Sequence, residues 1–183
     1  MKISIITVVL NQASTIHNTI ESVLSQIYPD VEYIIIDGGS TDGTRELVKS
    51  YGSRITRFIS EPDLGMYDAL NKGIKLATGE IIGSLNADDV YTGNQVLERI
   101  AGAFREFQPD TLFADVHFVK EPHLDKPVRY ISGKLFKPYK FRFGFMPPHP
   151  TIFVKKQLFE QYGYYKTDYK IAADYELIIR FLY

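Results

Sequence analysis

The N-terminal half of the chain alternates short apolar runs with longer amphipathic segments, and this alternation limits the fold more than any other feature. The runs are rich in β-branched residues and are typical of strands buried on both faces. They cover Ile3–Val9, Glu32–Ile36 and Ile81–Leu85, with Arg54–Ser60 as a further candidate. Strands that alternate with helices predict an α/β fold whose mostly parallel central sheet is flanked by crossover helices.

Three amphipathic segments between these runs are predicted helices. In the first, Ser14 is the expected N-cap, and apolar residues then recur at helical spacing: Ile16, Ile20, Val23, Leu24 and Ile27. The second covers about Thr44–Tyr51. The third carries its apolar residues between Met66 and Ala77, and Gly79 is expected to end it.

Polar residues follow the predicted strands where each strand ends. They are Asn11, Asp37, and the stretch Asn86–Asp89. Because the carboxyl ends of parallel strands share one edge, and ligands of open α/β sheets bind there, these residues are expected in one cleft.

Two adjacent carboxylates, Asp88 and Asp89, end the strand Ile81–Leu85. Mg²⁺ and similar hard cations bind through one or two carboxylates together with substrate phosphates. The pair therefore predicts a divalent metal, Mn²⁺ or Mg²⁺, that holds a diphosphate. The alternative is a solvated turn, since Asn and Asp favour turns.

The second half of the chain is less regular. Its predicted helices are Val96–Phe107, Lys156–Tyr162 closed by Gly163, and Ala172–Tyr183; its predicted strands are Thr111–Val119, Val128–Ile131 as a partner for it, and Thr151–Val154. The prolines of Pro147–Pro150 argue against regular structure there. The final helix ends while still apolar, as in a chain that continues, so truncation after Tyr183 is one interpretation.

Length and composition suit one globular domain, because the chain has 183 residues and 45% hydrophobic side chains. The net charge of −1 gives no indication of nucleic acid as a partner. The absence of Cys excludes disulfides and thiolate metal sites. No signal-peptide pattern and no apolar run of about 18 residues is present. The expected location is the cytoplasm, with the inner face of the membrane left open.

Five sequence blocks together resemble family 2 glycosyltransferases of the GT-A fold, a group that builds bacterial surface polysaccharides. The blocks cover residues 7–11, 32–44, 60–74, 85–89 and 172–176. The resemblance extends over nearly all 183 residues. It implies inverting transfer of a sugar from a nucleotide-diphosphate donor, with residues 1–90 as the nucleotide-binding half and 91–183 as the acceptor-binding half.

The resemblance also implies residue roles. Thr7, Val9 and Asn11 line the nucleotide, and Asp37 hydrogen-bonds its base. Asn86-Ala87-Asp88 matches the Asp-x-Asp motif with its first Asp replaced by Asn86, which leaves open whether Asp88 or Asp89 is the principal metal ligand. Asp174 matches the general base.

The physical logic of inversion supports one of these roles separately. Inversion needs a carboxylate on the far face of the sugar to take the acceptor hydroxyl's proton. Asp174 lies near the start of the last predicted helix, where the helix favours an ionised carboxylate. Alternatively, Asp174 only stabilises that helix, and Asp37 only forms the Asp-Gly-Gly turn.

Other polar residues have two interpretations each. Gly65 would let the backbone approach the donor, and Asp68 and Asn71 would face it from one helix, or they form a solvated helix start. His149 would touch the metal or diphosphate, or is incidental. The basic and aromatic stretch Lys134–Phe145 would bind donor phosphate or a lipid-diphosphate acceptor, or it covers the sheet with its Lys side chains in water.

Two other functions remain as alternatives, a nucleotidyltransferase and a non-catalytic nucleotide-sugar-binding module. The first is disfavoured because Val8–Ala13 lacks the Gly-rich, basic loop it would need. Expected partners are a nucleotide-sugar donor, with a uridine diphosphate first and thymidine or guanosine forms next, and a saccharide or lipid-linked acceptor. Peripheral membrane association and homo-oligomer formation are left open.

Overall fold

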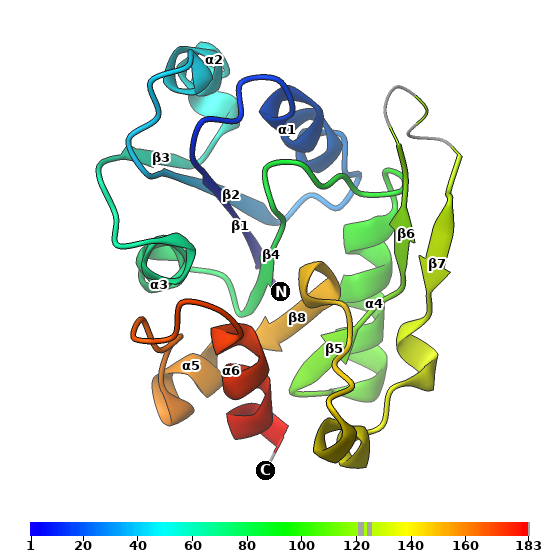
Figure 1. Ribbon diagram of the computed structural model, residues 1–183. Coiled ribbons are helices and arrows are strands. Elements are labelled where there is room, and N and C mark those ends of the chain that lie inside the picture. Colours follow the sequence, from blue (N-terminus) through cyan, green and yellow to red (C-terminus); the bar gives the residue numbers. More distant parts are fainter. Residues whose placement is uncertain (121–122, 124–125, 183) are drawn as a thin grey trace.

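The central sheet has six strands in the order β3-β2-β1-β4-β8-β5 (Figure 1). This computed structural model describes residues 1–120, 123 and 126–182. The strands are β1 (Ile3–Val9), β2 (Val31–Asp37), β3 (Arg57–Ser60), β4 (Ile81–Ser84), β5 (Thr111–Phe113) and β8 (Ile152–Lys155). Among these strands β8 runs opposite to the other five, and the pairs among β1, β2, β3 and β4 are all parallel, so the sheet is mostly parallel, as predicted.

Helices cover both faces of the sheet (Figure 1). They are α1 (Ile16–Leu24), α2 (Thr44–Ser50), α3 (Met66–Leu76), α4 (Val96–Phe107), α5 (Lys156–Tyr162) and α6 (Ala173–Leu182). Helices α1, α2 and α4 pack with Ile3 and Ile5 on one face, and α3, α5 and α6 pack with Ile6 on the other. Side chains alternate between faces along a strand, which explains why β1 is apolar almost throughout.

The second half of the chain departs from several predictions. The single strand predicted at Thr111–Val119 is wrong: β5 joins the main sheet, whereas β6 (Val116–Phe118) forms a separate hairpin with β7 (Arg129–Ile131). The predicted pairing of this region with residues 128–131 is confirmed. The Pro147–Pro150 segment is partly regular, because the 3₁₀ helix η4 covers His149–Thr151. Proline is tolerated in a first helical turn, where its missing N–H has no partner to lose.

Two predicted helix boundaries are also wrong. The N-cap of α1 is Thr15 rather than Ser14, and it makes no side-chain capping bond. Helix α3 ends at Leu76, before Gly79. A β-carbon at Gly79 would lie 2.8 Å from the backbone nitrogen of Ser4, so this glycine permits close approach to β1 instead. By contrast, Gly163 closes α5 as predicted, with a φ of 88°.

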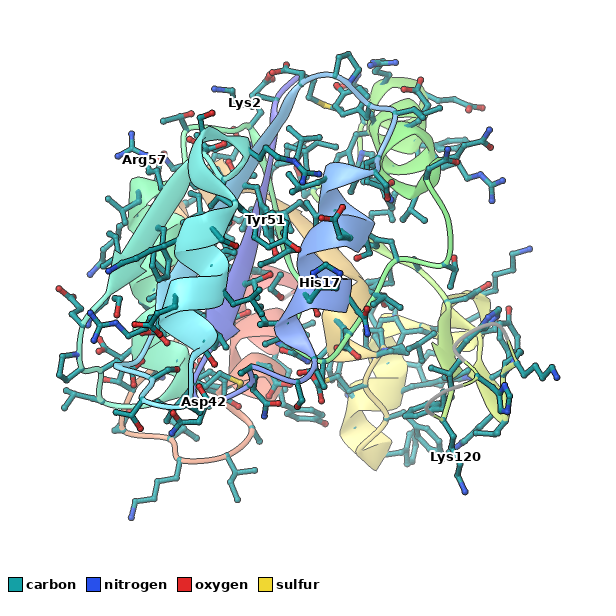
Figure 2. All side chains as sticks on the ribbon, turned by 90° about the horizontal axis from the view of Figure 1, so that it is seen from above. Lys2, His17, Asp42, Tyr51, Arg57 and Lys120 are labelled. Carbon is teal, nitrogen blue, oxygen red and sulfur yellow. The ribbon has the colours of Figure 1, made fainter. Side chains whose placement is uncertain are left out.

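The strand register places the predicted polar groups at one edge. Val9 of β1 lies opposite Asp37 of β2, and Asp37 lies opposite Ser60 of β3. Figure 2 shows Asp42, which follows β2, at the opposite end of the molecule from Lys2, which precedes β1. The parallel arrangement therefore separates a carboxyl edge, rich in polar loops, from an amino edge.

A buried carboxylate fixes the amino edge. Glu32 is 3% exposed and lies beside Ser4 in the β1–β2 register. Its oxygens accept hydrogen bonds from Ser4 Oγ (2.5 Å), Thr78 N (2.7 Å) and Thr78 Oγ1 (3.0 Å). Burial alone would raise the pKa of Glu32, but these hydrogen bonds outweigh it and hold the pKa below its usual value. The network joins β1, β2 and the segment that leads from α3 to β4.

Replacing Glu32 with Ala is expected to lower the free energy of unfolding by about 2–3 kcal/mol at pH 7, since it leaves buried donors unpaired. Because the folded pKa of Glu32 is depressed, its contribution is present above the unfolded pKa of about 4.3 and is lost as the pH falls below it. Urea unfolding of wild type and Glu32→Ala at pH 7 and pH 3.5 checks this. An equal difference at both pH values would contradict it.

Candidate functional site

Two loops at the carboxyl edge, which follow β1 and β2, are tied together by hydrogen bonds. Four backbone N–H groups donate to side chains of the opposite loop: Asn11 N to Ser40 Oγ (2.7 Å), Gln12 N to Thr44 Oγ1 (3.0 Å), Ala13 N to Asp42 Oδ2 (3.0 Å) and Thr41 N to Asn11 Oδ1 (2.9 Å). The Ser-Thr-Asp-Gly-Thr sequence after β2 thus has a clear structural purpose. It holds the β1–α1 loop against the β2–α2 loop.

Asp37 is fully buried at the centre of this edge. Its carboxylate accepts hydrogen bonds from Ser60 Oγ (2.6 Å), Ser40 N (3.1 Å) and Gly39 N (3.2 Å). These donors belong to its own loop and to β3. The turn role considered for Asp37 is therefore present, while its role toward a nucleotide base stays a prediction.

The three residues predicted from β1 differ in accessibility. Thr7 is fully buried and its hydroxyl pairs with Tyr33 Oη at 3.1 Å. Val9 packs in the core between the sheet and α1. Asn11 is exposed and has a φ of 52°, a left-handed conformation that is uncommon for residues other than Gly. Of the three side chains, only that of Asn11 is open to a ligand.

Asp63 is an acidic group at this edge that the sequence analysis missed. A β-carbon at Gly38 would lie 2.6 Å from Asp63 Oδ2, so this carboxylate occupies the space over Gly38. Its other oxygen accepts a hydrogen bond from Gly65 N at 2.9 Å. The signal in the sequence was Gly38 itself, because a residue without a side chain beside Asp37 leaves room for a group from elsewhere.

The Asn86–Asp89 stretch forms a turn directly after β4. Asn86 Nδ2 donates to Asp89 Oδ2 at 2.9 Å, and Asp89 N donates to Asn86 O at 3.1 Å. Burial raises the pKa of Asp89, and the neighbouring charge of Asp88 raises it further, against the effect of the Asn86 amide. The turn that was weighed as an alternative is thus present, and it holds two carboxylates close enough to disfavour full ionisation.

A groove of about 700 Å³ opens beside these carboxylates. The residues that line it include Asp88, Asp89, Tyr91, Pro150 and Thr151. Within residues 1–120, 123 and 126–182, no three or more His, Asp or Glu side chains gather as a metal site. Two neighbouring carboxylates are nevertheless ligands of the kind that a divalent cation takes together with substrate phosphates.

The residues predicted from α3 are engaged in local contacts. Asp68 Oδ2 accepts a hydrogen bond from Leu64 N (3.1 Å) and pairs with Lys72 (3.4 Å). Asn71 is 8% exposed, and its amide exchanges two hydrogen bonds with the backbone of Tyr165. Gly65 is exposed with a φ of 116°, and a β-carbon there would meet nothing within 4 Å. Of these three residues, only Gly65 has a backbone that a ligand can approach.

Asp174 lies in the first turn of α6, as predicted. Tyr67 Oη donates to Asp174 Oδ1 at 3.3 Å, and the Tyr67 ring stacks on Tyr165 with centroids 5.5 Å apart. Ala172, just before the helix, has a φ of 67°. Strained backbone of this kind persists where the surroundings enforce it, and it is common at functional sites.

His149 interacts electrostatically with Asp174. Burial lowers the pKa of His149, and the negative charge of Asp174 acts against that shift. Its Nε2 atom is buried and has no hydrogen-bond partner in the described part of the chain. A buried nitrogen without a hydrogen-bond partner costs free energy. The Nε2 atom of His149 can therefore form one further hydrogen bond.

The structure does not bring all the predicted residues together. Asn11 and Asp37 belong to the tied loops after β1 and β2, and the predicted acidic residues farther along the chain lie in two other clusters. Asn86, Asp88 and Asp89 adjoin the groove, and Asp174, His149 and Tyr67 form the second cluster. The chain itself joins them, because Pro150 of the groove directly follows His149. Asp174 is not among the residues that line the groove.

Known proteins are similar to this chain in sequence and in fold. The model of the family "Glycosyl transferase family 2" matches residues 4–163. A "PGL/p-HBAD biosynthesis glycosyltransferase" of Mycobacterium bovis is 32% identical over 181 residues, which are 97% of this chain and 68% of that protein.

Solved structures agree in fold. Staphylococcus aureus TarS, residues 1–349 in complex with UDP, has a TM-score of 0.79 at 22% identity, over 97% of this chain and 54% of that one. The mannosyltransferase PcManGT of Pyrobaculum calidifontis, in complex with GDP-Man and Mn²⁺, has a TM-score of 0.66 at 22% identity, over 91% and 48%. This chain thus spans about half the length of these solved proteins. It belongs to glycosyl transferase family 2 and is a glycosyltransferase of the GT-A fold.

Proposed function

We propose that the chain transfers a sugar, with inversion, from a nucleotide-diphosphate donor to a hydroxyl of a saccharide or lipid-linked acceptor in surface polysaccharide biosynthesis. The observation that carries this is the arrangement of Asp174. Asp174 accepts a hydrogen bond from Tyr67 and its charge acts on His149. Pro150, the residue after His149, lines the groove of Asp88 and Asp89. A uridine diphosphate donor is favoured, because TarS binds UDP and UDP-GlcNAc.

The donor is assigned to the first half of the chain, residues 1–90. Asn11, Gly65 and Asp63 offer an open amide, open backbone and a carboxylate at the carboxyl edge. That edge is supported by three buried residues, Thr7, Val9 and Asp37. The neighbouring loops are held by Asp68 and Asn71. The acceptor is assigned to residues 91–183, where the groove meets the β6–β7 hairpin.

Asp88 and Asp89 would hold Mn²⁺ or Mg²⁺, with Asn86 orienting Asp89. When bound, the cation offsets the negative charge that develops on the diphosphate leaving group. A related mannosyltransferase structure contains Mn²⁺, which supports this choice.

Asp174 would take the proton of the acceptor hydroxyl. The hydroxyl oxygen then bonds to the anomeric carbon as the bond from that carbon to the diphosphate oxygen breaks, and the nucleoside diphosphate leaves. Asp174 lies in the first turn of α6. The unpaired Nε2 atom of His149 is available to hydrogen-bond a sugar hydroxyl or the diphosphate.

Release of UDP from UDP-GlcNAc in the presence of Mn²⁺ tests the proposal. Asp174→Asn is expected to lower release by about 100-fold or more, since general-base catalysis contributes on this scale. The variant should still show a thermal shift with UDP and Mn²⁺, whereas Asp88→Ala should lose the part of that shift that depends on Mn²⁺.

Asp110→Asn is the matched control, because Asp110 pairs with Lys155 at 2.8 Å at the amino edge of the sheet. It should keep both release and the thermal shift. Binding of nucleotide without release in the wild type would indicate a non-catalytic binding module. Full release by Asp174→Asn would rule out the assigned base.

Asp89→Asn is expected to stabilise the metal-free protein at pH 7. The folded pKa of Asp89 is raised, so its ionised form destabilises the fold above the unfolded pKa of about 3.9, and this cost disappears below it. The melting temperature should therefore exceed that of the wild type at pH 7 and match it at pH 3.5. With Mn²⁺ and UDP added, the order should reverse. A variant less stable than wild type in the metal-free form at pH 7 would contradict this.

Tyr67→Phe is expected to lower kcat by about tenfold, the effect of one hydrogen bond to a charged group, with little change in KM for the donor. Burial and the charge of Asp174 raise the pKa of Tyr67 above 10, so its phenol remains a donor and the loss should be constant between pH 6 and 9.

Tyr51→Phe removes a comparable phenol hydrogen bond, to His17 Nδ1 at 2.6 Å between α2 and α1, and should leave kcat unchanged. These two groups lie together in Figure 2. If both variants lowered kcat tenfold, the cause would be a general loss of stability and not the loss of the hydrogen bond to Asp174.

A further inference from the structure

One exposed segment is unusually rich in aromatic side chains. The cationic–aromatic loop, residues 134–146, carries Tyr139, Phe143 and Phe145, which are 55%, 71% and 63% exposed. Exposed single apolar residues are ordinary, but three large aromatic ones within seven positions concentrate exposed apolar area on one short segment. Such surfaces usually mark a site of contact with a protein or a membrane.

The same loop concentrates positive charge. It holds four of the chain's 21 Lys and Arg residues and none of its 22 Asp and Glu residues, although the whole chain has a net charge of −1. Lys134, Lys137 and Arg142 are exposed. This local excess is complementary to an anionic surface and would be repelled by a cationic one.

The loop is fixed by its own interior residues. Phe141 is buried and packs edge-to-face against Phe136 and Tyr175, with centroids 5.1 Å apart in both pairs. Tyr175 Oη also donates to the backbone oxygen of Phe141 at 2.5 Å. The 3₁₀ helix η3 (Pro138–Phe143) ends at Gly144, which has a φ of 76°. With Phe141 inside, its neighbours are directed outward.

The loop adjoins the second cluster of the site. Its partner Tyr175 directly follows Asp174 in α6, and the chain runs from Phe145 through Met146 and two prolines to His149. In Figure 1 this segment lies next to α6. Anything that binds the loop is therefore close to the carboxylate assigned to the acceptor hydroxyl.

We propose that the cationic–aromatic loop binds the surface of an anionic lipid bilayer, with Phe143 and Phe145 in the interface and the cationic side chains on the headgroups. Aromatic side chains favour this interface, and each cation near an anionic surface strengthens binding by about fivefold. A free phosphate or pyrophosphate would use the cations but not the two phenylalanines. No helix within the described residues is long and apolar enough to cross a bilayer.

Flotation of the full chain with phosphatidylcholine vesicles, with and without 30% phosphatidylglycerol, tests the proposal. Binding is expected only to the anionic vesicles, with a decline as salt is raised from 50 to 500 mM. Inorganic pyrophosphate at 1 mM should not displace the chain. Displacement would instead assign the loop to a free or lipid-linked diphosphate, and equal binding to both kinds of vesicle would overturn the role of charge.

Two double variants separate the contributions. Phe143→Ser with Phe145→Ser, and Lys137→Glu with Arg142→Glu, should each lower the partition coefficient at least tenfold. The matched control is Phe107→Ser with Arg99→Glu on α4, since Phe107 is also 71% exposed. Donor hydrolysis in solution should be unchanged in all of them, which verifies folding. Equal losses in the control and loop variants, or no loss in either loop variant, would overturn the proposal.

Discussion

The hydrogen bonds between the β1–α1 and β2–α2 loops are the contact on which the rest of the site depends. Parallel strands bring their carboxyl ends to one edge, but they do not fix how the loops beyond that edge are arranged. Here, backbone N–H groups of one loop are satisfied by side chains of the other, and Asp37 anchors the second loop to β3. The sequence between β2 and α2 is therefore first a device for loop placement, and only its free groups remain for ligands.

Helix α3 performs a similar task for the second cluster. Tyr67 and Asn71, one turn apart, both hold Tyr165, the first by ring stacking and the second by two backbone hydrogen bonds. Tyr67 also donates to Asp174. A helix from the first half of the chain thus positions the carboxylate supplied by the last helix. The names donor half and acceptor half therefore say which ligand each part is proposed to bind. The two parts are not independent structural units.

The sequence was sufficient to predict the parallel core, because the apolar runs of β1 and β2 are typical of strands that are buried on both faces. The sequence did not predict strand pairing in the second half of the chain. Thr111–Val119 forms two strands rather than one, because β5 pairs with β8 while β6 pairs with β7. The donor contacts predicted for Asn71 and Asp37 stay predictions. The sequence did not indicate that neighbouring backbone and loop groups already occupy the oxygens of these two side chains. Asp63 was missed since its position depends on the fold around Gly38.

The distance in sequence between Tyr67 and Asp174 has a consequence during protein synthesis. The chain is made from its N-terminus, so β1 to β4, with Asp88 and Asp89, leave the ribosome long before α6 exists. A nascent chain at that stage has the two carboxylates proposed to hold the cation, but neither His149 nor Asp174. Asp174 meets Tyr67 only after α6 has packed against α3, so the carboxylate proposed to accept the proton is the last group added to the site.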